Sequence, residues 1–234
     1  MGKKKEDLKI SYVLPVLNSQ ATIAQCLKSL LKQEIPAHEI IIIDDGSTDY
    51  TVHIIKEMIK LDERKVIRLI QNKERKGSAY SRNMANNEAT GDVIAVCDAD
   101  FYEPNRSKAI SVFFEEFPEK SIFYSALECR DADNPQHIWR VDAFEWDFNS
   151  KCPISHPTVA YKKEVTNEIE YHEESVDTDL YEFFLLDAHK KGYLFGGCQE
   201  SLMIKIEGNT YRDRSDARLL KIKKYEKLGI KVDM

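Results

Sequence analysis

Two aspartates, Asp98 and Asp100, stand directly after the apolar run 93–97, where a buried strand is expected to end. In open α/β sheets, ligands bind at the carboxyl ends of the strands. Two carboxylates one residue apart can share a divalent cation, and a cation at this place could neutralise a diphosphate. An acidic strand end is also a common solvated turn, so the meaning of this pair depends on the segments around it.

A second acidic pair, Asp44 and Asp45, follows a run of isoleucines and precedes a glycine. The residues 47–49 after the glycine are typical of a helix start, where they cap the helix and complement its dipole. Capping does not account for Asp44 and Asp45, since paired carboxylates at a buried strand end repel each other unless a ligand or a cation offsets them. Carboxylates accept hydrogen bonds from a base imide or a ribose hydroxyl, so a nucleotide is a candidate ligand.

The elements that must position these residues alternate regularly through the first half of the chain. The all-isoleucine run fits a strand that is buried on both faces, and amphipathic helices follow the strands. This alternation predicts a parallel, right-handed, doubly wound α/β sheet. The expected strands are 10–16, 39–43, 66–70 and 92–97, and the expected helices are 21–32, 48–61 and 78–89.

The alternation ends after Asp100. Phe144, Trp146 and Phe148 alternate in a mixed segment, which favours one side of a strand packed in the core over a sugar-stacking face. No internal repeat or linker divides the chain, so we expect one domain. The further elements that we expect are helices at 108–117, 177–190 and 212–227, and strands at 121–128, at 156–161, near Tyr193 and at 202–206.

The composition limits the class of protein. A chain of 234 residues with 42% hydrophobic residues can bury the core of one domain. The formal charge of −6 argues against broad binding to nucleic acid. The sequence shows neither a run that could span a membrane nor a signal peptide, so we expect a cytoplasmic protein, with peripheral attachment where the acceptor is lipid-linked. The five cysteines are widely separated, and we expect thiols rather than disulfides.

Four segments, taken together, resemble the inverting glycosyltransferases of family 2, which have the GT-A fold. Each segment alone is weak evidence, but their order and spacing both match. The resemblance implies a Rossmann-like, mixed, mostly parallel sheet flanked by helices, a nucleotide-sugar donor, and a divalent cation, Mn²⁺ or Mg²⁺. The segments are Val13 to Asn18, Asp44 to Asp49, Gly77 to Asn83, and Gly91-Asp92 leading to Asp98-Ala99-Asp100.

The resemblance also implies roles for single residues on the donor side. Pro15 and Asn18 would shape the first loop around the nucleotide, while Asp44 and Asp45 would contact its base and ribose. Arg82 would face the nucleotide or its phosphates, which suits a planar and permanently charged guanidinium. Taken without the other motifs, Arg82 would be interpreted as a solvated helix residue.

The cation, by the same resemblance, would be held through Asp100 with the assistance of Asp98. Asp98 and Ala99 also belong to the donor-binding set. Glu207 stands in a segment where the family often has a histidine that completes the metal site. A carboxylate could bind a hard cation at that place as well.

Asp177 takes the position of the catalytic base. The segment 173–180 is similar to the family pattern Glu-Asp-x-Asp-Leu, although Val176 replaces its glutamate. An aspartate in the first turn of a helix is also favourable as a cap, without any catalysis. The segment 154–165 is similar to the family strand on the acceptor side. We assign His156 no catalytic role, because a histidine before a proline is typical of a turn or of the core.

These features predict a metal-dependent inverting glycosyltransferase in a single domain, 1–234, with a donor half of about 8–103 and an acceptor-binding, catalytic half of about 104–234. We favour a UDP-sugar over a GDP-sugar, a hexosyl or N-acetylhexosaminyl group, and a saccharide or glycoconjugate acceptor. Val176 and Glu207 leave open a nucleotide-sugar-binding protein or a degenerate transferase. A sugar nucleotidyltransferase would need a Gly-rich phosphate loop, where the chain has residues 18–20 instead.

Overall fold

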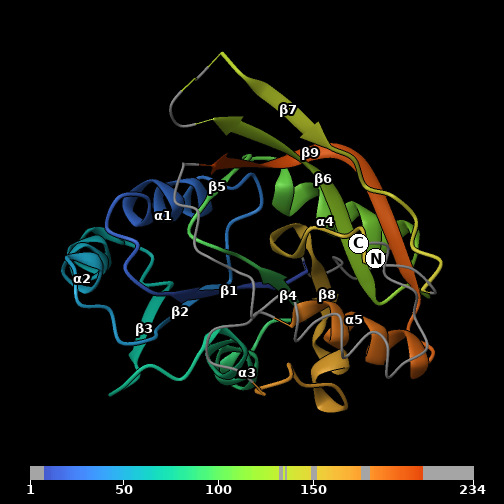
Figure 1. Ribbon diagram of the computed structural model, residues 1–234, viewed down its shortest axis with the longest axis horizontal. Helices are drawn as coiled ribbons and strands as arrows, with labels where there is room; N and C mark the ends of the chain where they lie inside the picture. Colours follow the sequence, from blue (N-terminus) through green and yellow to red (C-terminus); the bar gives the residue numbers. More distant parts are fainter. Residues whose placement is uncertain (1–7, 132–133, 135, 149–151, 175–179, 208–234) are drawn as a thin grey trace, which may run out of the picture.

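Figure 1 shows the computed structural model of the protein, which describes residues 8–131, 134, 136–148, 152–174 and 180–207. The strands are β1 (Ile10–Val16), β2 (Glu39–Asp44), β3 (Ile67–Gln71), β4 (Val93–Val96), β5 (Phe101–Tyr102), β6 (Ile122–Asp131), β7 (Ile138–Val141), β8 (Ala160–Lys162) and β9 (Phe195–Glu207). The helices are α1 (Ile23–Leu31), α2 (Thr51–Leu61), α3 (Ser78–Glu88), α4 (Arg106–Glu116) and α5 (Tyr181–Lys190), with short 3-10 turns η1 (His156–Thr158) and η2 (Lys163–Asn167).

All strands belong to one mixed sheet, in the order β3-β2-β1-β4-β8-β6-β9-β5, with β7 paired to β6. The first four strands in this order are parallel, as the alternation predicts. The chain runs from β1 outward through β2 to β3 on one side, and returns to place β4 on the other side. The carboxyl ends of β1 and β4 therefore flank a topological switch point, where open α/β sheets bind ligands.

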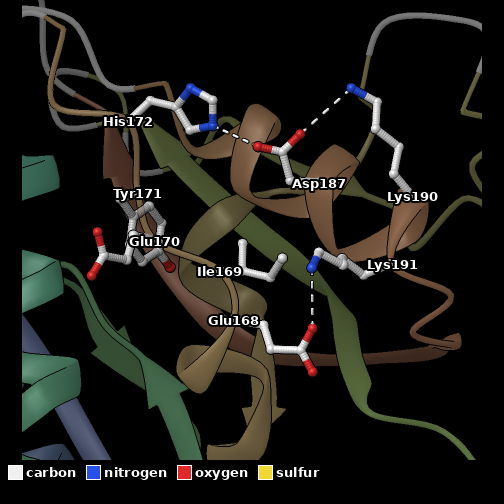
Figure 2. Close-up of a pocket in the computed structure, with 8 residues that line it drawn as sticks. All are labelled: Glu168, Ile169, Glu170, Tyr171, His172, Asp187, Lys190 and Lys191. Carbon is white, nitrogen blue, oxygen red and sulfur yellow. Dashed lines mark hydrogen bonds and ion pairs between the residues drawn. The ribbon is translucent and has the colours of Figure 1, made fainter.

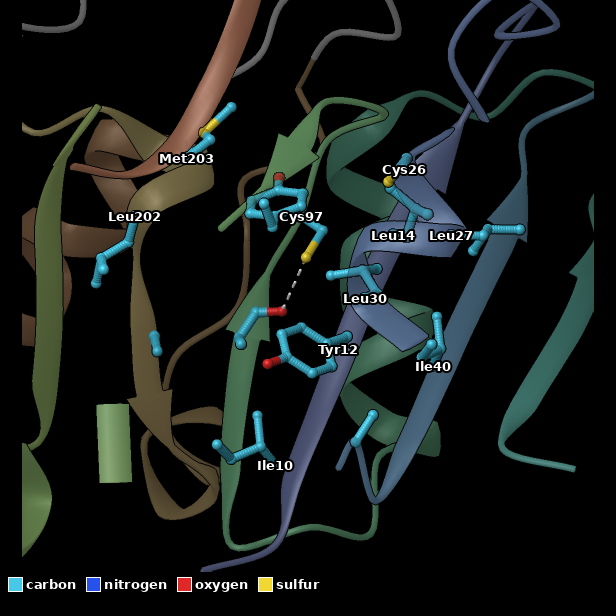
Figure 3. Packing of buried hydrophobic residues seen from close by; sticks show 14 of the residues in the cluster. Ile10, Tyr12, Leu14, Cys26, Leu27, Leu30, Ile40, Cys97, Leu202 and Met203 are labelled. Carbon is cyan, nitrogen blue, oxygen red and sulfur yellow. Dashed lines mark hydrogen bonds between the residues drawn. The ribbon is translucent and has the colours of Figure 1, made fainter. Parts of the chain in front are cut away.

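The isoleucines of β2 are buried on both faces of the sheet. Ile40 and Ile42 belong to one core cluster, which includes residues of α1, α2 and α4, while Ile41 and Ile43 belong to the other, with residues of α3 and α5. Successive side chains of a strand point to opposite faces, so one short run supplies both layers. Figure 3 shows part of the first cluster, where Leu27 of α1 lies close to the strands.

The second half joins the first through antiparallel pairs, β4 with β8 and β8 with β6, whereas β9 runs parallel to β6. The prediction of two short strands near Tyr193 and at 202–206 is wrong, since β9 is one strand of 13 residues. It follows β6 through register shifts, and its glycines let it pass close to neighbouring rings. A Cβ on Gly196 would come within 2.5 Å of Phe113, and one on Gly197 within 2.7 Å of Tyr124.

The expected strand 156–161 is wrong in its first part, because residues 156–158 form the 3-10 turn η1. Pro157 has no N–H to donate to a sheet, and the hydroxyl of Thr158 donates to the carbonyl oxygen of Ser155 at 2.7 Å. The described part of the helix expected at 177–190 begins at Tyr181, and the helix expected at 212–227 lies outside the described residues.

The aromatic alternation after β7 does not form a strand. Phe144 is 56% exposed, whereas Trp146 is buried. Phe148 stacks on His189 of α5 with 3.6 Å between the ring centroids. The prediction of a strand packed in the core is therefore wrong for the backbone. For the side chains it is correct for Trp146, which is buried, and in part for Phe148, which is half-buried and packs against the core, and it is wrong for Phe144. Across the described ranges, no helix combines the length and the apolarity that crossing a membrane requires.

Arg106, at the start of α4, is fully buried and joins the two halves. Its guanidinium donates to the carbonyl oxygens of Val96 at 2.8 Å and of Pro157 at 3.1 Å. It also lies 4.5 Å from the ring centroid of Tyr102. Carbonyl dipoles and an aromatic face thus offset a charge that water does not reach. The end of β4 is in this way fixed to η1.

We expect Arg106→Leu to lower the free energy of unfolding by about 2–4 kcal/mol, because it leaves buried carbonyl oxygens without their donor. Urea unfolding followed by circular dichroism measures this loss. Lys108→Leu, on the same helix at a side chain that is 64% exposed, serves as the control and should change stability by no more than about 0.5 kcal/mol. Equal stability of the two variants would contradict the role assigned to Arg106.

Candidate active site

The acidic turn 98–100 follows β4 at the switch point and is fixed by a buried tyrosine. The hydroxyl of Tyr102 accepts the backbone N–H of Asp98 at 2.8 Å and donates to the carbonyl oxygen of Asp98 at 3.3 Å. The N–H of Asp100 donates to that carbonyl oxygen at 2.7 Å. Burial raises the pKa of Tyr102 well above its usual value, so the hydroxyl keeps its proton. The backbone of the turn is therefore fixed, with both aspartates half-buried at the edge of the sheet.

Arg82 of α3 reaches the acidic turn. Its terminal nitrogen lies 3.0 Å from Oδ1 of Asp98, with the arginine side chain 3% exposed and the aspartate side chain 41% exposed. The guanidinium also lies 5.7 Å from the ring centroid of Tyr171. The interpretation of Arg82 as a solvated helix residue is therefore wrong. A buried, permanent positive charge beside the turn offsets the repulsion between Asp98 and Asp100.

Asp45 is buried and holds the loop that precedes α3. Its Oδ1 accepts hydrogen bonds from Nδ2 of Asn72 at 2.9 Å and from the backbone N–H of Lys76 at 2.8 Å, and its Oδ2 accepts the N–H of Gly77 at 2.8 Å. Three donors thus converge on one carboxylate. The structure gives Asp45 a positioning role for the loop that the sequence analysis missed, and its contact with base or ribose stays a prediction.

Asp44 is the last residue of β2, and its carboxylate makes fewer and longer hydrogen bonds than that of Asp45. Its Oδ1 accepts the backbone N–H of Ser47 at 3.2 Å, and its Oδ2 lies 3.4 Å from Nε2 of Gln71. An ionised carboxylate offers about four lone-pair sites. The longer bonds of Asp44, compared with those of Asp45, make it the better candidate of the two to accept a further hydrogen bond from a nucleotide.

Asn18 shapes the loop after β1. Its backbone has φ of 50°, a left-handed conformation in which asparagine is enriched. Its N–H donates to Oγ of Ser47 at 2.9 Å, and its Oδ1 accepts the N–H of Thr48 at 2.9 Å. Pro15 lies within β1, opposite Ile43 of β2. The loops after β1 and β2 are therefore joined, while contact of Pro15 and Asn18 with a nucleotide stays a prediction.

Asp98 and Asp100 suit a divalent cation that also binds phosphate. In the part of the chain that the structure describes, no three acidic, histidine or cysteine side chains gather as a metal cluster. A pair of carboxylates does not fit a closed structural site, which takes four protein ligands. It does fit Mg²⁺ or Mn²⁺ in a nucleotide site, where phosphate oxygens and water complete the coordination.

Glu207 is the last residue of β9, and its side chain lies outside the described part of the structure. The backbone of β9 does pass beside the acidic turn, because Ile204 pairs antiparallel with Phe101, the residue after Asp100. Beyond Ile204 the strand runs in the direction of the turn. The assignment of Glu207 as a metal ligand stays a prediction, as does the role of Ala99.

Asp177 lies outside the described residues, but the chain is described on both sides of it. On one side, Oε1 of Glu173 accepts a hydrogen bond from Nδ2 of Asn83 at 2.7 Å. On the other side, Tyr181 begins α5. One flank therefore contacts α3, the helix that carries Arg82, and the role of Asp177 as base stays a prediction.

His156 is a core residue, as its place before a proline predicts. It is buried, and its Nε2 lies 2.9 Å from the hydroxyl of Tyr171. The hydroxyl of Tyr161 lies 3.3 Å from that of Tyr171 and donates to Oδ1 of Asn86 at 2.9 Å. Burial raises the pKa of Tyr161 to about 12, so it stays a donor. The sequence contains no local signal for Tyr102 or Tyr171, because their partners come from distant segments.

A pocket of about 500 Å³ lies between the segment 168–172 and α5 (Figure 2). Several of its charged groups are paired with one another: Nε2 of His172 lies 2.6 Å from Asp187, and Lys191 lies 3.3 Å from Glu168. Its lining contains none of the predicted donor or metal residues. Tyr171 lines the pocket and also faces Arg82, so the pocket borders the site without forming it.

The model of the family described as Glycosyl transferase family 2 matches residues 11–171. The glycosyltransferase GlyG of Streptococcus pneumoniae is 28% identical over 180 residues, which are 69% of this chain and 59% of GlyG. The poly(ribitol-phosphate) β-N-acetylglucosaminyltransferase TarS of Staphylococcus aureus is 28% identical over 141 residues, which are 59% of this chain and 24% of TarS. The chain thus spans less than two thirds of these relatives.

Two solved structures share the fold. Residues 1–349 of S. aureus TarS in complex with UDP-GlcNAc superpose with a TM-score of 0.67 at 19% identity, covering 91% of this chain and 64% of that chain. The mannosyltransferase PcManGT from Pyrobaculum calidifontis, in complex with GDP-Man and Mn²⁺, gives a TM-score of 0.66 at 18% identity, covering 95% of this chain and 62% of that chain. At such identities the likeness shows the fold alone, and the predicted fold class is confirmed.

We expect Asp45→Asn to lower the free energy of unfolding by about 1–3 kcal/mol, because the new amide turns an N–H₂ group toward backbone donors. Hydrogen exchange should quicken at the amides of Lys76 and Gly77, which lose their acceptor. Mass spectrometry of the peptide 72–77 measures the exchange. Glu63→Gln, the matching change at an exposed side chain, should leave both quantities unchanged. Native exchange rates in Asp45→Asn would show that the carboxylate does not hold this loop.

Proposed function

Because this chain belongs to glycosyl transferase family 2, we propose that it transfers a sugar from a nucleotide-diphosphate donor to an acceptor hydroxyl, with inversion at the anomeric carbon. The acidic turn 98–100 carries this proposal. It lies at the switch point of the parallel strands, with the buried guanidinium of Arg82 beside it. A positive charge and two carboxylates lie where open α/β sheets bind ligands, which supports a diphosphate site.

The nucleotide of the donor lies along the ends of β1 and β2 in this proposal. Asp44 accepts a hydrogen bond from the base or ribose, and Asp45 contributes chiefly by holding the loop 72–77. Pro15 and Asn18 form the wall on the other side. The hydrogen bonds between the loops after β1 and β2 support this arrangement, because they fix both walls before a ligand arrives.

The diphosphate lies next to the acidic turn. Asp100, with Asp98, would hold Mn²⁺ or Mg²⁺, and Ala99 would line the same turn. When bound, a divalent cation offsets the negative charge that grows on the departing diphosphate. Arg82 supplies a fixed positive charge on the same side, and its ion pair orients the carboxylate of Asp98.

The proposed base is Asp177. It takes the proton from the acceptor hydroxyl while that oxygen attacks the anomeric carbon, and the bond from that carbon to the diphosphate oxygen breaks on the opposite face. A single displacement of this kind inverts the configuration. The family pattern in 173–180 supports the assignment, and so does the hydrogen bond that joins Glu173 to the helix of Arg82.

A UDP-sugar with a hexosyl or N-acetylhexosaminyl group is the donor that we propose. The curated relative TarS is named as an N-acetylglucosaminyltransferase, and a structure of TarS holds UDP-GlcNAc. The structure of PcManGT holds GDP-Man, so GDP is the alternative nucleotide. For the acceptor we propose a saccharide or glycoconjugate hydroxyl, in keeping with the poly(ribitol-phosphate) in the name of TarS.

We expect Asp177→Asn to lower transfer at least about 10³-fold while UDP affinity stays within about twofold, because the amide cannot take a proton but leaves the donor site intact. Product formation from a panel of UDP- and GDP-sugars measures transfer, and calorimetry measures affinity. Glu116→Gln, at an exposed side chain of α4, should keep both values. Native turnover in Asp177→Asn would remove it as the base, and donor binding without transfer or hydrolysis in the native protein would favour a degenerate transferase.

UDP should raise the melting temperature strongly only when Mn²⁺ is present, because the cation offsets the negative charge of the diphosphate in the proposed site. A bound ligand stabilises the folded state by about 2.7 kcal/mol at 100 times its Kd. We expect Asp100→Asn to abolish the part of the shift that depends on Mn²⁺. Asp92→Asn, at an exposed aspartate that precedes β4, should keep it. A larger shift with GDP than with UDP would reverse the nucleotide assignment. An equal shift with EDTA in place of Mn²⁺ would contradict the role of the cation.

A further inference from the structure

The side chain of Asn83 binds a segment that lies 88 residues further along the chain. Its Nδ2 donates to the carbonyl oxygen of Tyr171 at 2.9 Å and to Oε1 of Glu173 at 2.7 Å, and its Oδ1 accepts the N–H of Tyr171 at 2.7 Å. The amide of Asn83 thus bonds to both the N–H and the carbonyl oxygen of Tyr171, as the backbone of a neighbouring strand would. Asn83 is 8% exposed, so these bonds are shielded from water.

The side chain of Tyr171 extends this attachment into the core. Its ring stacks on Phe184 of α5, with centroids 4.3 Å apart and planes 9° apart. Its hydroxyl lies 2.9 Å from Nε2 of His156. The face of the ring lies 5.7 Å from the guanidinium of Arg82, which contacts Asp98. Tyr171 is therefore in contact with α3, with α5 and with the arginine of the donor site.

The beginning of α5 is held by the same group of residues. The ring of His156 stacks on Tyr181, with centroids 4.5 Å and planes 15° apart. The hydroxyl of Tyr181 donates to the carbonyl oxygen of Ile154 at 3.3 Å. The chain is thus anchored at Tyr171 and Glu173 before Asp177 and at Tyr181 after it, and His156 contacts both anchors.

Helix stability does not explain the choice of asparagine at position 83. Asparagine is less favourable than alanine inside a helix by about 0.5 kcal/mol, and its side chain here makes no bond that closes the helix. All three of its bonds go to residues 171–173. The adjacent Arg82 reaches the acidic turn from the same helix. One turn of α3 therefore contacts both the donor site and the segment that leads to Asp177.

We propose that Asn83 is a positioning residue, which holds the segment of the catalytic base in register with the donor site through Tyr171 and Glu173. The inference rests on the proposed function, because it gives Asp177 the role of base. In this proposal Asn83 acts through these two residues and has no direct role toward donor or acceptor. Its substitution should therefore lower kcat and leave donor binding unchanged, since a displacement of about 1 Å at the reacting groups can cost about 100-fold in rate.

The first test compares Asn83→Ala with Asn87→Ala, which changes an exposed asparagine one turn later on α3. We expect kcat to fall about 10–100-fold in Asn83→Ala, with the Kd for UDP and Mn²⁺ within about twofold, and both values native in Asn87→Ala. Native kcat in Asn83→Ala would overturn the inference. So would a loss that appears in the Kd and not in kcat, because that pattern indicates damage to the donor site.

The second test exploits the direction of the bond to Glu173. Asn83→Asp keeps an acceptor for the N–H of Tyr171 but sets a carboxylate against both Glu173 and the carbonyl oxygen of Tyr171, which repel it. We expect kcat to fall in Asn83→Asp, to stay native in Glu173→Gln, and to recover in part when both changes are combined, because the glutamine amide restores a donor between the two side chains while the carbonyl oxygen of Tyr171 stays without one. No recovery in the double variant would overturn the inference.

If Asn83→Ala fails to fold, the double variant of Asn83→Asp and Glu173→Gln still tests the inference, because both new side chains have nearly the size of the native ones. Circular dichroism at the assay temperature verifies that every variant is folded. Failure of this inference is distinguishable from failure of the proposed function. A native protein that transfers no sugar from any donor refutes the function, whereas a native protein that transfers sugar while Asn83→Ala matches it refutes only the role of Asn83.

Discussion

Parallel pairing of β1 with β2 on one side and β4 on the other is the constraint on which the site depends. The register places Val16 beside Asp44 and Val13 beside Val96, so strand ends that are far apart in the sequence meet at one edge. Parallel strands require long crossovers, and the helices that form them cover both faces of the sheet. Charged groups do not occur inside β1, β2 and β4, and they stand where these strands begin or end.

Carboxylates gathered at one edge repel one another, and the fold offsets the repulsion with groups drawn from other segments. Asp98 has the guanidinium of Arg82, and Asp45 has two backbone N–H groups and the amide of Asn72. These hydrogen-bond donors are ordered when the chain folds, so the cost of ordering them belongs to folding rather than to ligand binding. The hydroxyl of Tyr102 fixes the backbone of the acidic turn through its hydrogen bonds to Asp98.

The two halves of the chain are joined by polar groups as well as by the sheet. Arg106 binds the end of β4 to η1, and Asn83 binds α3 to the segment 171–173. Both contacts are buried, and buried polar contacts specify one relative placement because any other leaves their groups unpaired. The proposed donor site and the segment of the proposed base are therefore connected by directional bonds, whereas apolar packing alone would tolerate small displacements.

The sequence by itself determined the first half of the fold and the position of the acidic turn. Strand and helix periodicity is a signal carried by neighbouring residues, and so is the place of Asp44 and Asp98 directly after apolar runs. Only the tertiary structure decided the single long strand β9, the 3-10 turn at Pro157, and the partners of Asp45 and Asn83. The partners of Asp45 lie 27 to 32 residues away and those of Asn83 lie 88 to 90 residues away. A hydrogen bond between distant segments leaves no periodic pattern in either of them. Such a hydrogen bond forms only when the folded chain brings the N–H group and the accepting oxygen together.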